Sequence, residues 1–149
     1  MKRKKPIRKI GKARLLTRAK KAAEEAWKRA CRRRDKDTCQ MCGAKKEDGA
    51  VIQVDHCFTR TCGNLFYDVR NGTCLCKPCH TNKTYKNYNM DRRVDSFVHN
   101  REGSAWWTES SAAAEKSGAR KYYLEELEQI KSDLDGMFLS DQAYILPQK

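Results

Sequence analysis

The chain has 149 residues with a mean hydropathy of −0.91, and 34% of its residues are charged. This composition leaves material for one small core and excludes a large one. The sequence has no run of about 18 apolar residues that could cross a membrane, and no apolar segment of a secretory signal peptide. We therefore expect a cytoplasmic protein without a membrane partner, whose cysteines stay reduced.

The net charge of +13 resides in the first part of the chain. Residues 1–38 contain 17 Lys and Arg against 4 Asp and Glu, whereas the remaining residues contain 15 of each sign. Such a basic segment predicts a polyanionic partner such as DNA, because lysine and arginine at phosphates release bound counterions. A solvated tail that only aids solubility is the alternative. Membrane-surface binding is less favoured, because the segment has few large apolar residues to insert.

The first predicted elements are an arm and a helix. Residues 1–11, with Pro6 and Gly11, predict a disordered basic arm. Residues 12–36 form a basic segment in which residues 12–34 predict a helix, because Ala, Lys, Arg and Glu dominate and apolar residues recur on one narrow stripe. Trp27 is the largest member of this stripe, and we expect it to anchor the helix on the core.

The middle of the chain, residues 37–90, is turn-rich and predicts a small core. Alternation over residues 50–56 favours a strand, residues 72–75 favour a second one, and a helix is expected from about Pro78.

Residues 91–149 predict a helical extension, with helices near residues 92–101 and 121–137. Gly103 and residues 110–118 are predicted breaks. The last helix has a predicted buried face, with apolar residues at spacings of three and four: Leu124, Leu127, Ile130, Leu134 and Met137. The fold class that follows is α+β.

Two Cys-x-x-Cys pairs, "CQMCG" and "CKPCH", give the strongest local signal. Each such turn presents two thiolates, so the two pairs complete a tetrahedral site for a structural Zn²⁺, with ligands Cys39, Cys42, Cys76 and Cys79. Metal-free reduced thiols and redox chemistry are the alternatives. Cys31, Cys57, Cys62 and Cys74 are left over for packing, although Cys57 and Cys62 are also possible rivals of the assigned ligands.

A second group of polar residues lies between and beside the two pairs. Asp55 precedes His56 at the end of the first predicted strand. A carboxylate suits a hard divalent cation, and an imidazole can take a proton from water near neutral pH. Neighbouring side chains on a strand point to opposite faces. Asp55 and His56 can therefore reach one site only if the strand ends or bulges there. Asn71 and His80 can complete such a site, but Asn71 before Gly72 is also an ordinary turn, and His80 is also a candidate zinc ligand.

These residues resemble the HNH endonucleases over roughly residues 34–86. The shared pattern is "VDH" on the first strand, "N" before the second, and "LCKPCHTNKT" at the start of the helix, framed by the two cysteine pairs. The resemblance implies a zinc-stabilised, treble-clef-like ββα-metal core around one catalytic ion. It also implies that His56 is the general base, that Asp55 and His80 bind the ion, and that Asn71 fixes the loop and orients the base.

A narrower resemblance runs further along the chain. The chain resembles phage recombination endonucleases of the NinG type in the order of four segments. These are His56-x-x-x-Arg60, "LFYDVRNGTCLCKPC", "RRVDSFVHNREG" and "ARKYYLEELEQIKSDLDG". This chain differs from the NinG type at two positions: it has an Asp directly before His56, and it has a His rather than an Asn at position 80. Both features are closer to general HNH nucleases. The resemblance implies double-stranded, branched DNA as the substrate, in the host-cell cytoplasm if the chain is phage-encoded.

The implied reaction is metal-dependent hydrolysis of a DNA phosphodiester, for which Mg²⁺ or Mn²⁺ suits the hard ligands. Predicted DNA contacts are Arg60, Lys83 and the run Arg32, Arg33 and Arg34, each of which has a solvated surface charge as its alternative. The competing hypothesis is a zinc-stabilised nucleic-acid-binding protein without catalysis. The Asp55-His56 pair favours the enzyme, because a binding module does not need it.

Overall fold

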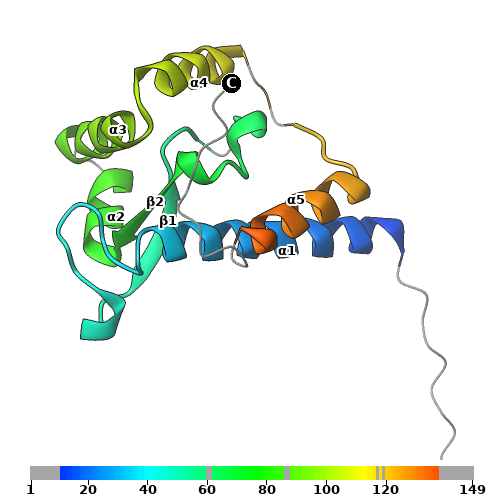
Figure 1. The fold of residues 1–149 in the computed structure, drawn as a ribbon, viewed down its shortest axis with the longest axis horizontal. Helices are drawn as coiled ribbons and strands as arrows, with labels where there is room; N and C mark the ends of the chain where they lie inside the picture. Colours follow the sequence, from blue (N-terminus) through cyan, green and yellow to red (C-terminus); the bar gives the residue numbers. More distant parts are fainter. Residues whose placement is uncertain (1–10, 60–61, 86–87, 117, 119, 138–149) are drawn as a thin grey trace, which may run out of the picture.

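The computed structural model describes residues 11–59, 62–85, 88–116, 118 and 120–137. The predicted disordered arm, apart from Gly11, lies outside these residues. In chain order (Figure 1) the elements are α1 (Lys12–Arg34), β1 (Ile52–His56), β2 (Gly72–Cys76), α2 (Lys77–Tyr85), α3 (Tyr88–Glu102), α4 (Ser104–Lys116) and α5 (Leu124–Gly136), with short 3-10 turns at Lys46–Asp48, Gly63–Leu65 and Val69–Asn71.

The two strands form an antiparallel hairpin at the centre of the molecule. Ile52 pairs with Cys76 and His56 pairs with Gly72, with an unbroken register between them. β2 is buried along its whole length, because α1 and α2 both pack against the hairpin (Figure 1). Both strands and the helix after them occur where the sequence predicts them.

Helix α1 is the longest element and matches the predicted range. Its buried stripe consists of small residues around one large ring: Ala23, Ala26, Trp27, Ala30 and Cys31. Trp27 is fully buried, and its indole Nε1 donates to the carbonyl oxygen of Asp68 at 2.9 Å. The predicted anchoring role of Trp27 is therefore confirmed.

Gly72 marks the point where β2 meets α1 most closely. A Cβ atom on this residue would collide with the Cys31 sulfur and lie 2.9 Å from the Trp27 ring. The hairpin can therefore approach the helix closely only because residue 72 has no side chain.

Helix α5 lies along α1 (Figure 1) and covers part of its apolar stripe. Leu127 and Leu134 are buried, as the periodicity predicts, and Arg29 of α1 pairs with Asp135 at 2.7 Å. Met137 is 51% exposed, because it follows the end of α5. Its assignment to the buried face was wrong.

The C-terminal half differs from the prediction at one predicted break. Gly103, with a φ of 89°, separates α3 from α4 as predicted. Residues 110–116, however, belong to α4. The run of three alanines there is strongly helix-forming, and Ser110 is buried, so the helix continues where the serines suggested a break.

The described residues thus form a small α+β protein that is mostly helical, with two clusters of buried residues. One joins the cysteine region to α3 and α4 through Leu75, Val94, Val98 and Trp106, and the other joins α1, Val69 and α5. None of the helices in the described ranges is long and apolar enough to span a membrane.

Candidate metal centre and active site

The four cysteines of the two Cys-x-x-Cys pairs come together in one cluster. Cys39 and Cys42 lie in the loop after α1, Cys76 ends β2, and Cys79 lies in the first turn of α2. Their sulfur atoms all lie within 4.8 Å of one another, and those of Cys42 and Cys76 are 3.6 Å apart. A tetrahedral zinc–thiolate site with bonds of about 2.3 Å has sulfurs about 3.8 Å apart. The cluster therefore has the size and donor set of a metal site.

The first pair is held in a tight turn that is tied to β2. The Gly43 amide donates to the carbonyl of Cys39 at 2.9 Å, and Gly43 has a φ of 76°, which favours glycine. The Gln40 amide donates to the carbonyl of Cys74 at 2.9 Å. These backbone bonds hold the first pair beside the second.

The thiols respond differently to this environment. For Cys39, burial opposes ionisation, but hydrogen bonds from the backbone amides of Cys76, Cys42 and Met41 together outweigh it and lower its pKa to about 7. Burial, together with the neighbouring thiols, raises the pKa of Cys79. One thiolate therefore forms readily near neutral pH, whereas a full set of thiolates requires a cation to balance the charge.

The other cysteines lie outside this cluster. Burial raises the pKa of Cys31 to about 12, as expected for an unreactive packing residue. The Cys57 thiol donates to Asp95 at 3.3 Å, and Cys62 lies 3.7 Å from the Thr59 hydroxyl. Within the described residues the cluster contains only the four predicted cysteines, so neither Cys57 nor Cys62 replaces a ligand.

A second polar cluster joins β1 to α2. Nε2 of His80 lies 3.3 Å from Oδ1 of Asp55, and the Lys83 ammonium lies 2.6 Å from Oδ2 of the same carboxylate. His80 follows Cys79 directly but is turned toward Asp55 and does not join the cysteine cluster. Asp55 and His80, predicted to share one site, are therefore brought together.

Lys83 is tightly held in this cluster. Burial disfavours its charged form, but Asp55, Cys57 and Asp91 outweigh this effect and raise its pKa. Its ammonium also donates to the backbone carbonyl of His56 at 3.1 Å, and its side chain is only 10% exposed. The sequence suggested a DNA contact for Lys83, but the structure gives it an internal one, because the neighbouring carboxylate needs a counter-charge.

His56 lies on the opposite side of β1 from the Asp55 carboxylate. Its ring stacks on Trp27 of α1, with centroids 4.1 Å apart and planes at 13°. Its Nε2 lies 2.9 Å from the carbonyl oxygen of Phe66, and the residue is 6% exposed. β1 keeps its regular register through His56, so adjacent side chains alternate and the imidazole does not enter the Asp55–His80 cluster.

Asn71 is fully buried beneath the loop that follows β1. Its side-chain oxygen accepts from the Phe58 amide at 2.7 Å, and its side-chain nitrogen donates to the carbonyls of Phe58 and Leu65 at 3.1 and 3.0 Å. The backbone carbonyl of Asn71 also accepts from the Cys57 amide. Asn71 therefore fixes the loop, while its effect on a catalytic base stays a prediction.

The predicted arginine contacts lie in different environments. Arg34 is 12% exposed and bonds to Asp35 and to the carbonyls of Val69 and Gly72, so it is not available to DNA. The bonds to Val69 and Gly72 could not be predicted from the sequence, because these carbonyls are distant in the chain. Arg32 donates to the carbonyl of Ile52 at 3.2 Å, whereas Arg33 is exposed. Arg60 lies outside the described residues.

No family model, curated protein or solved structure gives a significant match to this chain. The site is therefore interpreted from its own residues.

Proposed function

We propose that this chain is a metal-dependent DNA endonuclease with an HNH-like ββα-metal core. The observation that carries the proposal is the Asp55–His80 pair, whose facing oxygen and nitrogen are 3.3 Å apart. Neighbouring ligands of an octahedral Mg²⁺ shell are about 3.0 Å apart, given bonds of about 2.1 Å. Mg²⁺ or Mn²⁺ held there would supply positive charge to a scissile phosphate.

The surrounding residues support this role for the pair. Lys83 occupies only Oδ2 of Asp55, so Oδ1 stays directed at His80. A structural Zn²⁺ on the four cysteines would hold the start of α2, and with it His80, at a fixed position next to β1.

The proposed role of His56 as general base rests on the HNH resemblance, and it requires the ring to leave its stack on Trp27, because β1 turns His56 away from the Asp55–His80 pair. A carbonyl oxygen only accepts hydrogen bonds, so the contact with Phe66 assigns the proton of the neutral ring to Nε2. Nδ1 is then the unprotonated nitrogen of the neutral ring.

The substrate class follows from charge. α1 exposes a series of basic side chains, Lys12, Arg14, Arg18, Lys20, Lys21, Arg29 and Arg33, and the chain as a whole has a net charge of +13. Contacts of this kind bind the DNA backbone without reading its sequence. A preference for branched DNA rests on the NinG-type resemblance.

The second candidate function is a zinc-stabilised nucleic-acid-binding protein without catalysis. Two observations favour it. The first is that His56 is buried against Trp27, as a hydrogen-bonded core histidine would be. The charge of Asp55 is also already balanced by Lys83, so the cluster is stable without a metal ion.

The two candidates are distinguished by cleavage assays on plasmid and branched DNA with added Mg²⁺ or Mn²⁺. We expect wild-type protein to cleave and His80→Ala and Asp55→Asn to lose at least about a hundredfold in rate. His80→Ala is the sharper variant because the side chain is half-buried and contributes little to the core. His56→Ala should lose about 10²- to 10⁴-fold if the ring is the base.

The control is Lys116→Ala, an exposed change at the far end of α4, and thermal unfolding verifies that each variant is folded. Undiminished cleavage by His80→Ala and Asp55→Asn would exclude the proposed centre. A wild-type protein that binds DNA but cleaves no substrate with either metal would establish the second candidate.

A further inference from the structure

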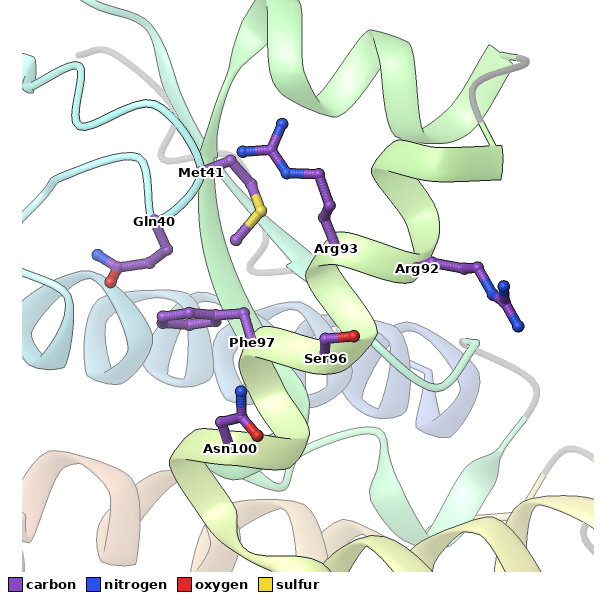
Figure 2. Close-up of a pocket in the computed structure, with 7 residues that line it drawn as sticks. All are labelled: Gln40, Met41, Arg92, Arg93, Ser96, Phe97 and Asn100. Carbon is purple, nitrogen blue, oxygen red and sulfur yellow. The ribbon is translucent and has the colours of Figure 1, made fainter.

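A groove on the outer face of α3 lies beside the first cysteine pair and has no part in the proposed catalysis. Its volume is about 390 Å³. One wall is a single face of α3, with residues at spacings of three and four: Arg93, Ser96, Phe97 and Asn100. The other wall is formed by Gln40 and Met41, which lie between Cys39 and Cys42 (Figure 2).

The groove has a positive edge. Arg92 and Arg93 are both exposed, and no carboxylate is among the residues that line the groove. Figure 2 shows the Arg93 side chain extending toward Met41, whereas Arg92 points away from Met41 and Phe97. Arg92 lies over the ring of Tyr88 at 5.0 Å, and within the described residues Arg93 has no ion pair. Arginine at such an edge suits a phosphate group.

The floor and the far end of the groove carry apolar and amide side chains instead of charged ones. Met41 and Phe97 are partly buried apolar residues that pack against the core. Gln40 donates its amide nitrogen to the carbonyls of Asp35 and Thr38, which leaves its side-chain oxygen as the atom that can face a ligand. Asn100 adds an exposed amide. Aromatic and apolar surfaces stack on bases, and amides bond to base edges.

We propose that this groove binds an unpaired nucleotide of a nucleic acid, with its phosphate at Arg93 and Arg92 and its base on Phe97 and Met41. The inference rests on the part of the proposed function that concerns nucleic-acid binding. An acidic peptide would use the two arginines but would leave the apolar floor and the amides without a role.

The groove also lies close to the candidate active site. Asp91, in the first turn of α3, is 3.8 Å from the Lys83 ammonium that holds Asp55. Arg92 and Arg93 follow directly in the chain. On this proposal a DNA strand that leaves the Asp55–His80 pair would run along α3 toward the groove, where an unpaired nucleotide next to a branch point would bind.

Fluorescence anisotropy of a labelled oligothymidine, compared with a duplex of equal length, tests this inference. No Mg²⁺ or Mn²⁺ is added, so cleavage does not interfere. We expect Arg93→Ala to weaken single-strand binding about tenfold. The slope of log affinity against log salt should fall by about 0.7 for this variant and about 1.4 for Arg92→Ala/Arg93→Ala. The matched control, Lys116→Ala/Lys121→Ala, removes the same charge from exposed sites outside the groove and should change single-strand binding much less.

Phe97→Leu separates base stacking from charge, because it keeps apolar volume and removes the ring. Single-strand binding should weaken at least about fivefold, while duplex binding stays unchanged. The inference is overturned if the arginine variant equals the lysine control, if Phe97→Leu binds the single strand as wild type does, or if polyglutamate competes as well as unlabelled oligothymidine. Thermal unfolding verifies that each variant is folded.

The cleavage assay and the binding assay together separate this inference from the proposed enzyme. If wild type never cleaves DNA but single-strand binding still depends on Arg93 and Phe97, the proposed endonuclease activity is refuted and the nucleotide-binding groove is supported. If wild type cleaves DNA and the groove variants bind oligothymidine as wild type does, the nucleotide-binding groove is refuted and the proposed endonuclease activity is supported.

Discussion

The Asp55 carboxylate divides its two oxygen atoms between two partners. Oδ2 accepts from the Lys83 ammonium, and Oδ1 faces His80. Since Asp55 and Lys83 are both largely shielded from water, their interaction is stronger than that of an exposed ion pair. Lys83 therefore stabilises the cluster in the absence of a divalent ion and keeps the carboxylate in place.

The first prediction concerns the pH dependence of this pair. The pKa of Lys83 is raised above its ordinary value of 10.5, so its contribution to stability is complete below pH 10.5 and is lost as the pH rises through the higher folded-state pKa. Lys83→Met should lower the free energy of unfolding at pH 8 by about 1–4 kcal/mol, because it leaves Asp55 without its counter-charge.

Urea unfolding from pH 8 to pH 12 measures this effect. The difference between wild type and Lys83→Met should shrink over the upper part of that range. A difference that is constant with pH would contradict the ion pair, and Lys77→Met, an exposed lysine on the same helix, serves as the control.

The cysteine cluster connects the loop after α1 to the end of β2 and to the first turn of α2, which follows β2 directly in the chain. The backbone supports this junction through the bond from the Lys77 amide to the carbonyl of Val51 at 2.9 Å. A metal ion bound at this point would stabilise the hairpin and α2 together, since its ligands would come from both.

The second prediction is that metal loss unfolds this junction. Wild-type protein should contain one zinc ion per chain, and Cys39→Ser should contain none and lose cooperative unfolding, because metal binding in small zinc domains contributes on the order of 10 kcal/mol. Metal analysis and thermal melts by circular dichroism measure both effects.

Cys62→Ser is the matched control, because Cys62 is buried but lies outside the cluster. It should keep its metal and most of its stability. Equal melting temperatures for Cys39→Ser and wild type would refute a structural metal.

The molecule as a whole is electrically asymmetric. Helix α1 extends along one side (Figure 1) and exposes basic residues, and its excess charge continues into the first eleven residues of the sequence. Residues 39–149 have equal numbers of acidic and basic residues. A DNA molecule would therefore be attracted first to the side that α1 occupies.

The third prediction follows from this asymmetry. Deletion of residues 1–11, which contain six Lys and Arg, should weaken duplex binding about equally for every DNA sequence tested. The salt slope should fall by up to about 0.9 for each lost phosphate contact. A deletion variant with an unchanged slope would show that the arm does not contact DNA, and unchanged unfolding verifies that the core is intact.

Much of the fold could be predicted from the sequence, because local patterns dominate there. Helix α1, the hairpin and the cysteine cluster follow from composition, alternation and ligand spacing. The polar contacts could not be predicted in the same way. Arg34 pairs with Asp35 and with distant carbonyls, and His56 stacks on Trp27, since these arrangements depend on how α1 packs on the sheet.

Because β2 approaches α1 closely, the reactivity of the Cys31 thiol reports whether these two elements are packed together. Its sulfur fills the space beside Gly72, and burial raises its pKa to about 12, so an alkylating reagent cannot modify it in the packed state. Alkylation of Cys31 requires the helix to separate from the hairpin. The labelling rate of this thiol, followed by mass spectrometry, therefore measures how often that separation occurs in the native protein.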